Sequence, residues 1–156
     1  LVENIATGCT VVINKILRDM IVAAPPKKAV MHDWWCYLLG SAFGEVIYDP
    51  TPTIKYRQHS ANYFGGSSGF LGIMKKRWRR FSKSPAGAYG ARLQAEEFLG
   101  LYGSRLDSDK LLLLSNFVGS KRSLGSRLKY ALFAKVRRQK LIDDALLRLL
   151  IILDWY

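Results

Sequence analysis

The sequence is poor in the residues that build disulfides and metal clusters. Its 156 residues include two cysteines, Cys9 and Cys36, and two histidines, His32 and His59. The cysteines form no CxxC pair and show no spacing typical of a zinc site. We therefore interpret them as free thiols of an intracellular protein, and their apolar neighbours predict that both lie in the core.

Long hydrophobic runs are also missing. The longest runs, residues 111–114 and 146–153, fall short of the roughly 18–20 apolar residues that span a bilayer, and the second contains Arg148. Residues 1–20 lack the basic start and apolar run of a signal peptide. Because the first residue is leucine rather than methionine, we expect the chain to be a piece of a longer protein.

Acidic residues are scarce in the second half of the chain. Residues 1–70 hold six Lys or Arg and five Asp or Glu, whereas residues 71–156 hold eighteen and seven. Nearly all of the net charge of +12 therefore comes from the second part. Such asymmetry predicts a polyanionic partner, either a membrane surface or a nucleic acid.

Hydrophobic patterning predicts an α/β protein. We expect strands at residues 9–15, 45–49 and 53–58, where β-branched residues or alternation dominate. Apolar spacing predicts helices at residues 15–22, 33–43, 91–102, 108–119, 123–140 and 141–156, the second of them buried on all sides. The chain thus divides into an α/β part (1–62), a Gly/Ser-rich and basic-aromatic junction (63–86) and a mainly α-helical basic region (87–156).

An acid and two tryptophans follow one another in "MHDWW" (31–35). Asp33 suits the N-cap of the predicted helix, and it also suits a general base, because a carboxylate held by helix amides can accept a proton. Trp34 and Trp35 lie about 100° apart on a helix and cannot share one face. Either both belong to the core, or one ring borders a cleft and stacks on a planar or sugar ligand.

A cation and an imidazole stand together in "YRQH" (56–59), where the third predicted strand ends. Arg57 and His59 point to the same side of a strand and so can hold a diphosphate, or His59 can bind a divalent metal. The alternative is an exposed polar strand end. His32 beside Asp33 gives only a weak zinc signal.

Basic and aromatic residues alternate in "KKRWRRFSK" (75–83). This composition favours contact with an anionic membrane surface. A solvated basic helix and a nucleic-acid site remain as alternatives, and we do not expect nucleic acid as a partner. The residues expected to touch the membrane are Lys75, Lys76, Arg77, Trp78, Arg79 and Arg80.

Three segments of residues 1–62 together resemble the C-terminal half of a family 2 glycosyltransferase catalytic domain, which has the GT-A fold. They are "ENIATGCTVVINK" (3–15), "MHDWW" (31–35) and "YDPTPTIKYRQHSAN" (48–62). The order and spacing look most like the rhamnosyltransferase-type enzymes of bacterial surface polysaccharides. The resemblance implies a partial GT-A mixed sheet with a buried helix, while residues 63–156 resemble the variable helical C-terminus of the family only loosely.

The resemblance also implies a role for each matching residue. Asp33 stands where the family keeps the base that deprotonates the acceptor hydroxyl in an inverting displacement. Thr7, Gly8 and Cys9 match the segment that lines the donor and acceptor cleft, and Trp34 and Trp35 flank the acceptor. His59, with Arg57 nearby, matches a position that holds the metal or the diphosphate. Mg²⁺ or Mn²⁺ is the implied cofactor, because a leaving diphosphate needs its charge neutralised.

The family's nucleotide-binding half and its metal-binding DxD motif have no counterpart here. The match to DxD is "DSD" (107–109), which we interpret as a helix cap. The glycine motifs GxGxxG and GxxxxGK[ST] are absent, as is the QxxRW motif of processive members. We therefore expect the complete enzyme to transfer a single sugar from a nucleotide sugar to a saccharide or lipid-linked acceptor, and this chain to be inactive without the missing half.

The protein would be cytoplasmic and peripheral on the inner face of the plasma membrane. The alternative is a non-catalytic basic helical module that binds an anionic membrane or nucleic acid.

Overall fold

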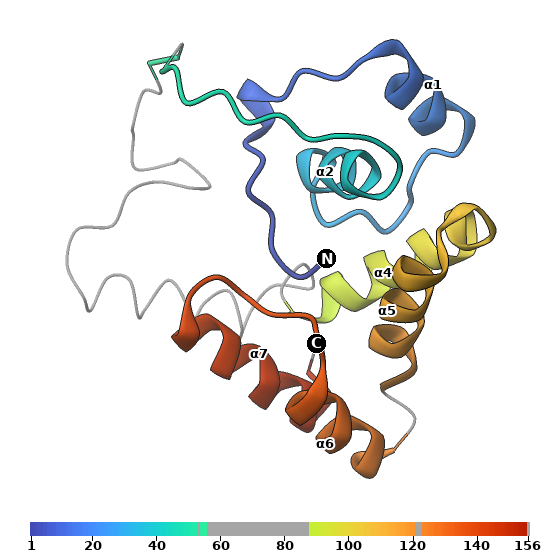
Figure 1. Ribbon diagram of the computed structural model, residues 1–156, viewed down its shortest axis with the longest axis vertical. Coiled ribbons are helices and arrows are strands. Elements are labelled where there is room, and N and C mark those ends of the chain that lie inside the picture. The colour runs from blue at the N-terminus through green and yellow to red at the C-terminus, as the bar shows by residue number, and fades with distance from the viewer. Residues whose placement is uncertain (53, 56–87, 121–122, 156) are drawn as a thin grey trace.

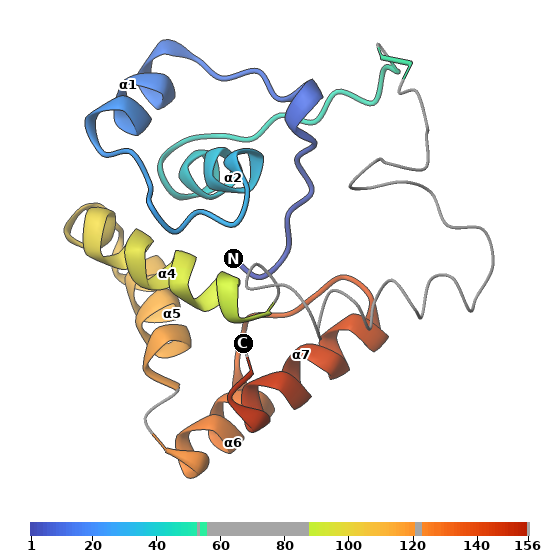
Figure 2. The same ribbon diagram turned by 180° about the vertical axis from the view of Figure 1, so that it is seen from behind.

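The described part of the protein is helical. The computed structural model describes residues 1–52, 54–55, 88–120 and 123–155 (Figure 1). In these ranges there are six α-helices and two short 3-10 helices, and no β-strand. The expected α/β fold, with a partial GT-A mixed sheet, is therefore wrong. Figure 2 shows the same arrangement from behind: α1 and α2 lie on one side of α4, and α6 and α7 lie on the other.

Helices α1 and α2 form where the sequence predicts them. Helix α1 spans Lys15–Ala23, and the side chain of its N-cap Asn14 accepts a hydrogen bond from the Leu17 N–H. Helix α2 spans His32–Phe43 and ends at Gly44. Its N-cap is Met31, so the prediction that Asp33 is the N-cap is wrong, and Asp33 lies one position inside the first turn.

Helices α4 and α5 pack against each other. Helix α4 spans Ala88–Tyr102, and the 3-10 helix η2, Gly103–Arg105, turns the chain into α5 at Ser108–Gly119. The carboxylate of Asp107 caps α5 by accepting the Lys110 N–H at 2.8 Å. This contact confirms that "DSD" (107–109) is a helix cap.

The last two helices are shorter than predicted. Helix α6 spans Leu124–Phe133 rather than residues 123–140, and α7 spans Leu141–Leu153. The two run antiparallel, because Arg148 near the middle of α7 donates to the Ala131 carbonyl of α6, while Arg127 pairs with Asp154 at 3.5 Å. Between them, the N–H groups of Arg138 and Gln139 donate to the carboxylates of Asp144 and Glu3, at 2.9 and 3.0 Å. These two carboxylates take the place of the backbone carbonyls that would accept the same N–H groups in a continuous helix.

The segments predicted as strands do not form a sheet. Residues 8–10 form the 3-10 helix η1, and the run that follows is extended as far as Asn14. Residues 45–49 have no regular structure, and most of 53–58 lies outside the described residues. Val12 is 95% and Ile47 83% exposed. β-branched residues favour strands only when neighbouring strands cover them, and the described residues supply none.

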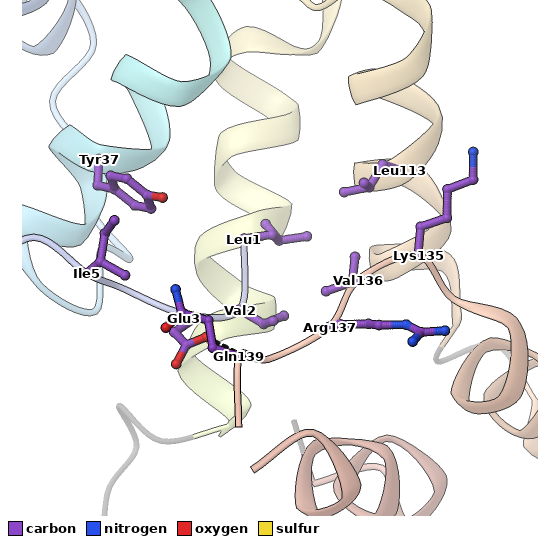
Figure 3. A pocket seen from close by; sticks show the side chains of 10 residues that line it. All are labelled: Leu1, Val2, Glu3, Ile5, Tyr37, Leu113, Lys135, Val136, Arg137 and Gln139. Carbon is purple, nitrogen blue, oxygen red and sulfur yellow. Dashed lines mark hydrogen bonds between the residues drawn. The ribbon is translucent and has the colours of Figure 1, made fainter. Parts of the chain in front are cut away.

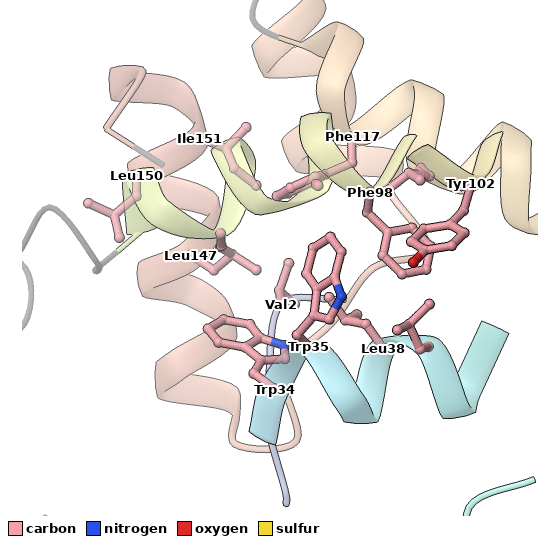
Figure 4. Packing of buried hydrophobic residues seen from close by; sticks show 14 of the residues in the cluster. Val2, Trp34, Trp35, Leu38, Phe98, Tyr102, Phe117, Leu147, Leu150 and Ile151 are labelled. Atoms are coloured by element: carbon pink, nitrogen blue, oxygen red, sulfur yellow. The ribbon is translucent and has the colours of Figure 1, made fainter. Parts of the chain in front are cut away.

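One aromatic core joins residues from both ends of the sequence. Figure 4 shows Trp35 of α2 against Phe98 and Tyr102 of α4, with the Trp35 and Phe98 ring centroids 5.4 Å apart in an edge-to-face arrangement. The buried cluster extends through Phe117 to Leu147 and includes Val2. The core thus crosses the expected boundary between residues 1–62 and 87–156. Helix α2 is not buried all round, because His32 and Ser41 are exposed.

Side chains of α4 hold the irregular loop after α1. Both carboxylate oxygens of Glu97 accept backbone N–H groups, from Lys27 and Lys28, each at 2.7 Å. The fully buried Gln94 accepts the Val30 N–H at 2.9 Å. Backbone groups that a helix or sheet would have paired are thereby satisfied, and α2 is fixed over α4.

Replacing Asp144 with asparagine is expected to lower the free energy of unfolding by about 1–3 kcal/mol. Burial acts to raise the pKa of this carboxyl, but the Arg138 N–H, the Arg148 side chain and the charge of Arg137 together lower it. A lowered pKa in the folded state stabilises the protein above the unfolded pKa of about 3.9, and this gain disappears as the pH falls through the folded value. Urea unfolding at neutral pH and at about pH 3 should show the difference shrinking in acid. Asp109→Asn, at an exposed site in α5, serves as the control.

Candidate functional site

The structure brings Asp33 together with residues that precede it by many positions. The Asp33 carboxylate is buried, and its Oδ1 accepts the Trp34 N–H at 2.7 Å and the Asn4 side-chain amide at 3.2 Å. Asn4 also holds its own turn, through the N–H and carbonyl of Ala6. The carboxylate thus has a fixed position in the first turn of α2, where the helix dipole stabilises negative charge.

Gly8 lies close to the other oxygen of this carboxylate. A Cβ placed on Gly8 would lie 3.5 Å from Oδ2 of Asp33 and 2.6 Å from Nε2 of His32. Any larger residue at position 8 would therefore have to displace the exposed His32 ring. Thr7, Cys9 and His32 are exposed around the buried carboxylate. Gly8 of the predicted Thr7–Gly8–Cys9 segment therefore lies beside Asp33 and His32.

Asn4 belongs to this site although no sequence pattern predicts it. Its amide matters only through a contact with a residue 29 positions away. The position of His32 next to Asp33 gives only a weak zinc signal in the sequence, and its closeness to Gly8 is a tertiary feature.

Trp34 and Trp35 belong to the core. They are 8% and 1% exposed, and Trp35 contacts the aromatic rings of α4. Their placement does not support the expected contact with an acceptor. Both indole N–H groups are buried without a hydrogen-bond acceptor in the described part of the chain. Of the two interpretations of this pair, the structure favours the core.

Several other predicted positions lie outside the described residues. These are Arg57, His59 and the basic-aromatic residues 75–80. Among the residues that the structure places, no group of three or more His, Cys, Asp or Glu side chains could hold a metal ion. In the same part of the chain, no helix is long and apolar enough to cross a membrane.

Two cavities lie away from Asp33. The first, of about 320 Å³, is shown in Figure 3 between the N-terminal segment and the link from α6 to α7. Glu3 and Gln139 meet at its edge through the bond described above, while Tyr37 of α2 and Arg137 face it from opposite sides. The second, of about 420 Å³, lies between α1 and the end of α4. Neither has Asp33 or His32 in its lining.

Comparison with known proteins finds no relative: no family model, no curated protein and no solved structure matches this chain.

The two cysteines are expected to differ in reactivity. Cys9 is exposed, contrary to the prediction that both lie in the core, and Cys36 is half-buried. Burial raises the pKa of the Cys36 thiol, and the charge of Asp33 raises it further. Because the thiolate is the reactive form, Cys9 should be alkylated at least about tenfold faster than Cys36 at neutral pH.

Mass spectrometry after iodoacetamide treatment, with Cys9→Ser as the control, measures both rates. Asp33→Asn should speed alkylation of Cys36, because a negative charge that raises its pKa is removed. Equal rates for the two thiols would contradict the placement of η1 and α2.

Proposed function

We propose that this chain carries the acceptor side of an inverting glycosyltransferase. Asp33 is the base: Oδ2 takes the proton from an acceptor hydroxyl, whose oxygen then forms a bond to the anomeric carbon of the donor sugar. The bond from that carbon to the diphosphate breaks in the same displacement, and the nucleoside diphosphate leaves with the electron pair. Asn4 and the helix amide position the base by bonding its other oxygen.

The observation that carries this proposal is the contact of Gly8 with Asp33 and His32. The sequence resemblance assigned the Thr7–Cys9 segment and Asp33 to one cleft, and they lie within contact distance despite a separation of about 25 positions. A carboxylate with one oxygen anchored and the other facing a glycine suits proton abstraction. Since the described residues form no strand and no family model matches, the proposal rests on this contact and on the sequence resemblance.

Donor binding belongs to another part of the proposed enzyme. The described residues contain no cluster for Mg²⁺ or Mn²⁺. The cofactor would be held mainly by a nucleotide-binding segment outside this chain, with His59 and Arg57 adding to the diphosphate side. The acceptor would be a saccharide or a lipid-linked sugar at the cytoplasmic face of the plasma membrane, to which residues 75–80 would attach the protein.

The test is a transfer assay on the complete polypeptide that carries this chain, with a panel of nucleotide sugars, Mg²⁺ or Mn²⁺, and membrane extract as acceptor. Release of the nucleoside diphosphate together with sugar incorporation supports the proposal, and NMR of the product should show inverted anomeric configuration. A protein that binds no nucleotide sugar and releases no diphosphate contradicts it and leaves the non-catalytic module as its function.

A further inference from the structure

We infer that the outer surface of the α6–α7 pair docks on an anionic membrane. This surface consists of the exposed apolar residues Leu124, Leu128, Leu132, Phe133, Leu141, Ile142, Leu149, Leu153 and Trp155. It shares no residue with the basic-aromatic segment 75–80 or with the Asp33 site, and it does not depend on the proposed sugar transfer.

The leucines of α6 face away from the core. Leu124, Leu128 and Leu132 recur every fourth residue and so form one stripe along the helix. The three side chains are 54, 40 and 70% exposed, whereas Ala131 of the same helix is buried. The most regular apolar stripe of the basic region is therefore left without a partner.

Helix α7 has an outer face of the same kind. Leu147, Leu150 and Ile151 are buried against the core, whereas Leu141 is 87% and Leu149 50% exposed. Asp144 and Arg148 of α7 pair with each other, and both are half-buried. Exposed apolar residues of this number on neighbouring helices mark an interaction surface.

The charges around this surface identify the partner. Between residues 123 and 155, every exposed charged side chain is basic: Lys129, Lys135, Arg137 and Lys140. The three acids of this segment, Asp143, Asp144 and Asp154, are half-buried, and the last two pair with arginines. Exposed leucines beside lysines, with no free acid among them, fit the boundary between acyl chains and anionic headgroups. A second copy of the chain fits poorly, because it would bring the same positive charges against these.

The helices would lie on the membrane rather than cross it. Helix α6 has 10 residues and α7 has 13, too short for the roughly 20 residues of a span. Each keeps one face in the protein core and offers the other to lipid. Apolar burial and lysine–headgroup attraction should both contribute, so binding should require anionic lipid and weaken with salt.

Vesicle flotation tests this surface with phosphatidylcholine vesicles that contain or lack about a third of phosphatidylglycerol. The double variant Leu128→Gln and Leu132→Gln should lose about tenfold or more of the partitioning onto anionic vesicles. Lys129→Gln with Lys140→Gln should lose several-fold, and most at low salt. All four positions are exposed, so the fold should survive, and circular dichroism checks it.

Matched control variants carry the same kinds of substitution outside the α6–α7 pair. Leu101→Gln with Leu112→Gln alters exposed leucines of α4 and α5, and Lys27→Gln with Lys28→Gln removes two exposed charges. Both should bind vesicles as the unchanged protein does. If the α6 variants bind equally well and only neutralisation of residues 75–80 abolishes binding, the inference is wrong. It is also wrong if sedimentation shows a dimer that the α6 leucine variants dissociate, because the surface is then covered by a second copy.

Discussion

Replacing Asp33 with asparagine is expected to lower kcat for sugar transfer by about 10²- to 10⁴-fold while leaving nucleotide-sugar affinity unchanged. Asparagine has nearly the same volume and keeps an oxygen that can accept from Asn4 and the Trp34 N–H, so the first turn of α2 should stay in place. In the proposed reaction, what is lost is the base that would take the acceptor proton. Steady-state kinetics of transfer, with calorimetric titration of the donor, measures the two effects separately.

A matched control removes a carboxylate that has no such role. Asp49 is exposed, and its side chain accepts hydrogen bonds from the N–H and the side chain of the nearby Thr51. Asp49→Asn should retain full turnover. An Asp33→Asn protein that transfers sugar at the normal rate would remove Asp33 as the base, even if the chain proves to belong to a glycosyltransferase.

Replacing Trp35 with alanine is expected to lower the free energy of unfolding by about 3–5 kcal/mol. Its indole is the largest fully buried side chain and touches Phe98 and Tyr102, which tie α2 to α4. Alanine would leave a cavity between the two parts of the chain that the core joins. Because native domains are stable by only about 5–15 kcal/mol, this one change removes a large share of the total.

Two further variants make the result interpretable. Trp35→Phe keeps an aromatic ring and should cost clearly less than Trp35→Ala. Trp155→Ala makes the same substitution at a residue that is 66% exposed and should change the unfolding free energy by no more than about 0.5 kcal/mol. Urea unfolding followed by circular dichroism measures all three, and equal losses for Trp35→Ala and Trp155→Ala would contradict the described core.

Local signals located four of the helices well. The expected ranges 15–22, 33–43 and 108–119 compare with Lys15–Ala23, His32–Phe43 and Ser108–Gly119. Apolar spacing, a capping residue and a terminating glycine lie within the helix itself and can be read without knowing its neighbours. The range 91–102 likewise lies within Ala88–Tyr102.

Local patterns gave wrong secondary structure where the conformation depends on residues far away in the sequence. A β-branched run such as 9–15 indicates a strand only if another strand pairs with it, and the described chain offers no partner. The predicted helix 123–140 ends at Phe133, and the N–H groups of Arg138 and Gln139 donate to the carboxylates of Asp144 and Glu3 instead of to helix carbonyls. Glu3 lies 136 positions from Gln139, and no local pattern reveals such an acceptor.

The features of the candidate site also divide into those that the sequence shows and those that depend on the fold. The sequence by itself determined the acid at the start of α2, the glycine in "TGC" and the concentration of positive charge after residue 70, because these are properties of single residues and short patterns. Only the tertiary structure decided that Gly8 meets Asp33 and His32, that Asn4 anchors the carboxylate, and that both tryptophans are buried. It also decided that the leucine stripe of α6 faces outward, because the space over the core on that side was filled by Ala131 and α7. Which face of an amphipathic helix is buried depends on what packs against it, and that is a property of the whole fold.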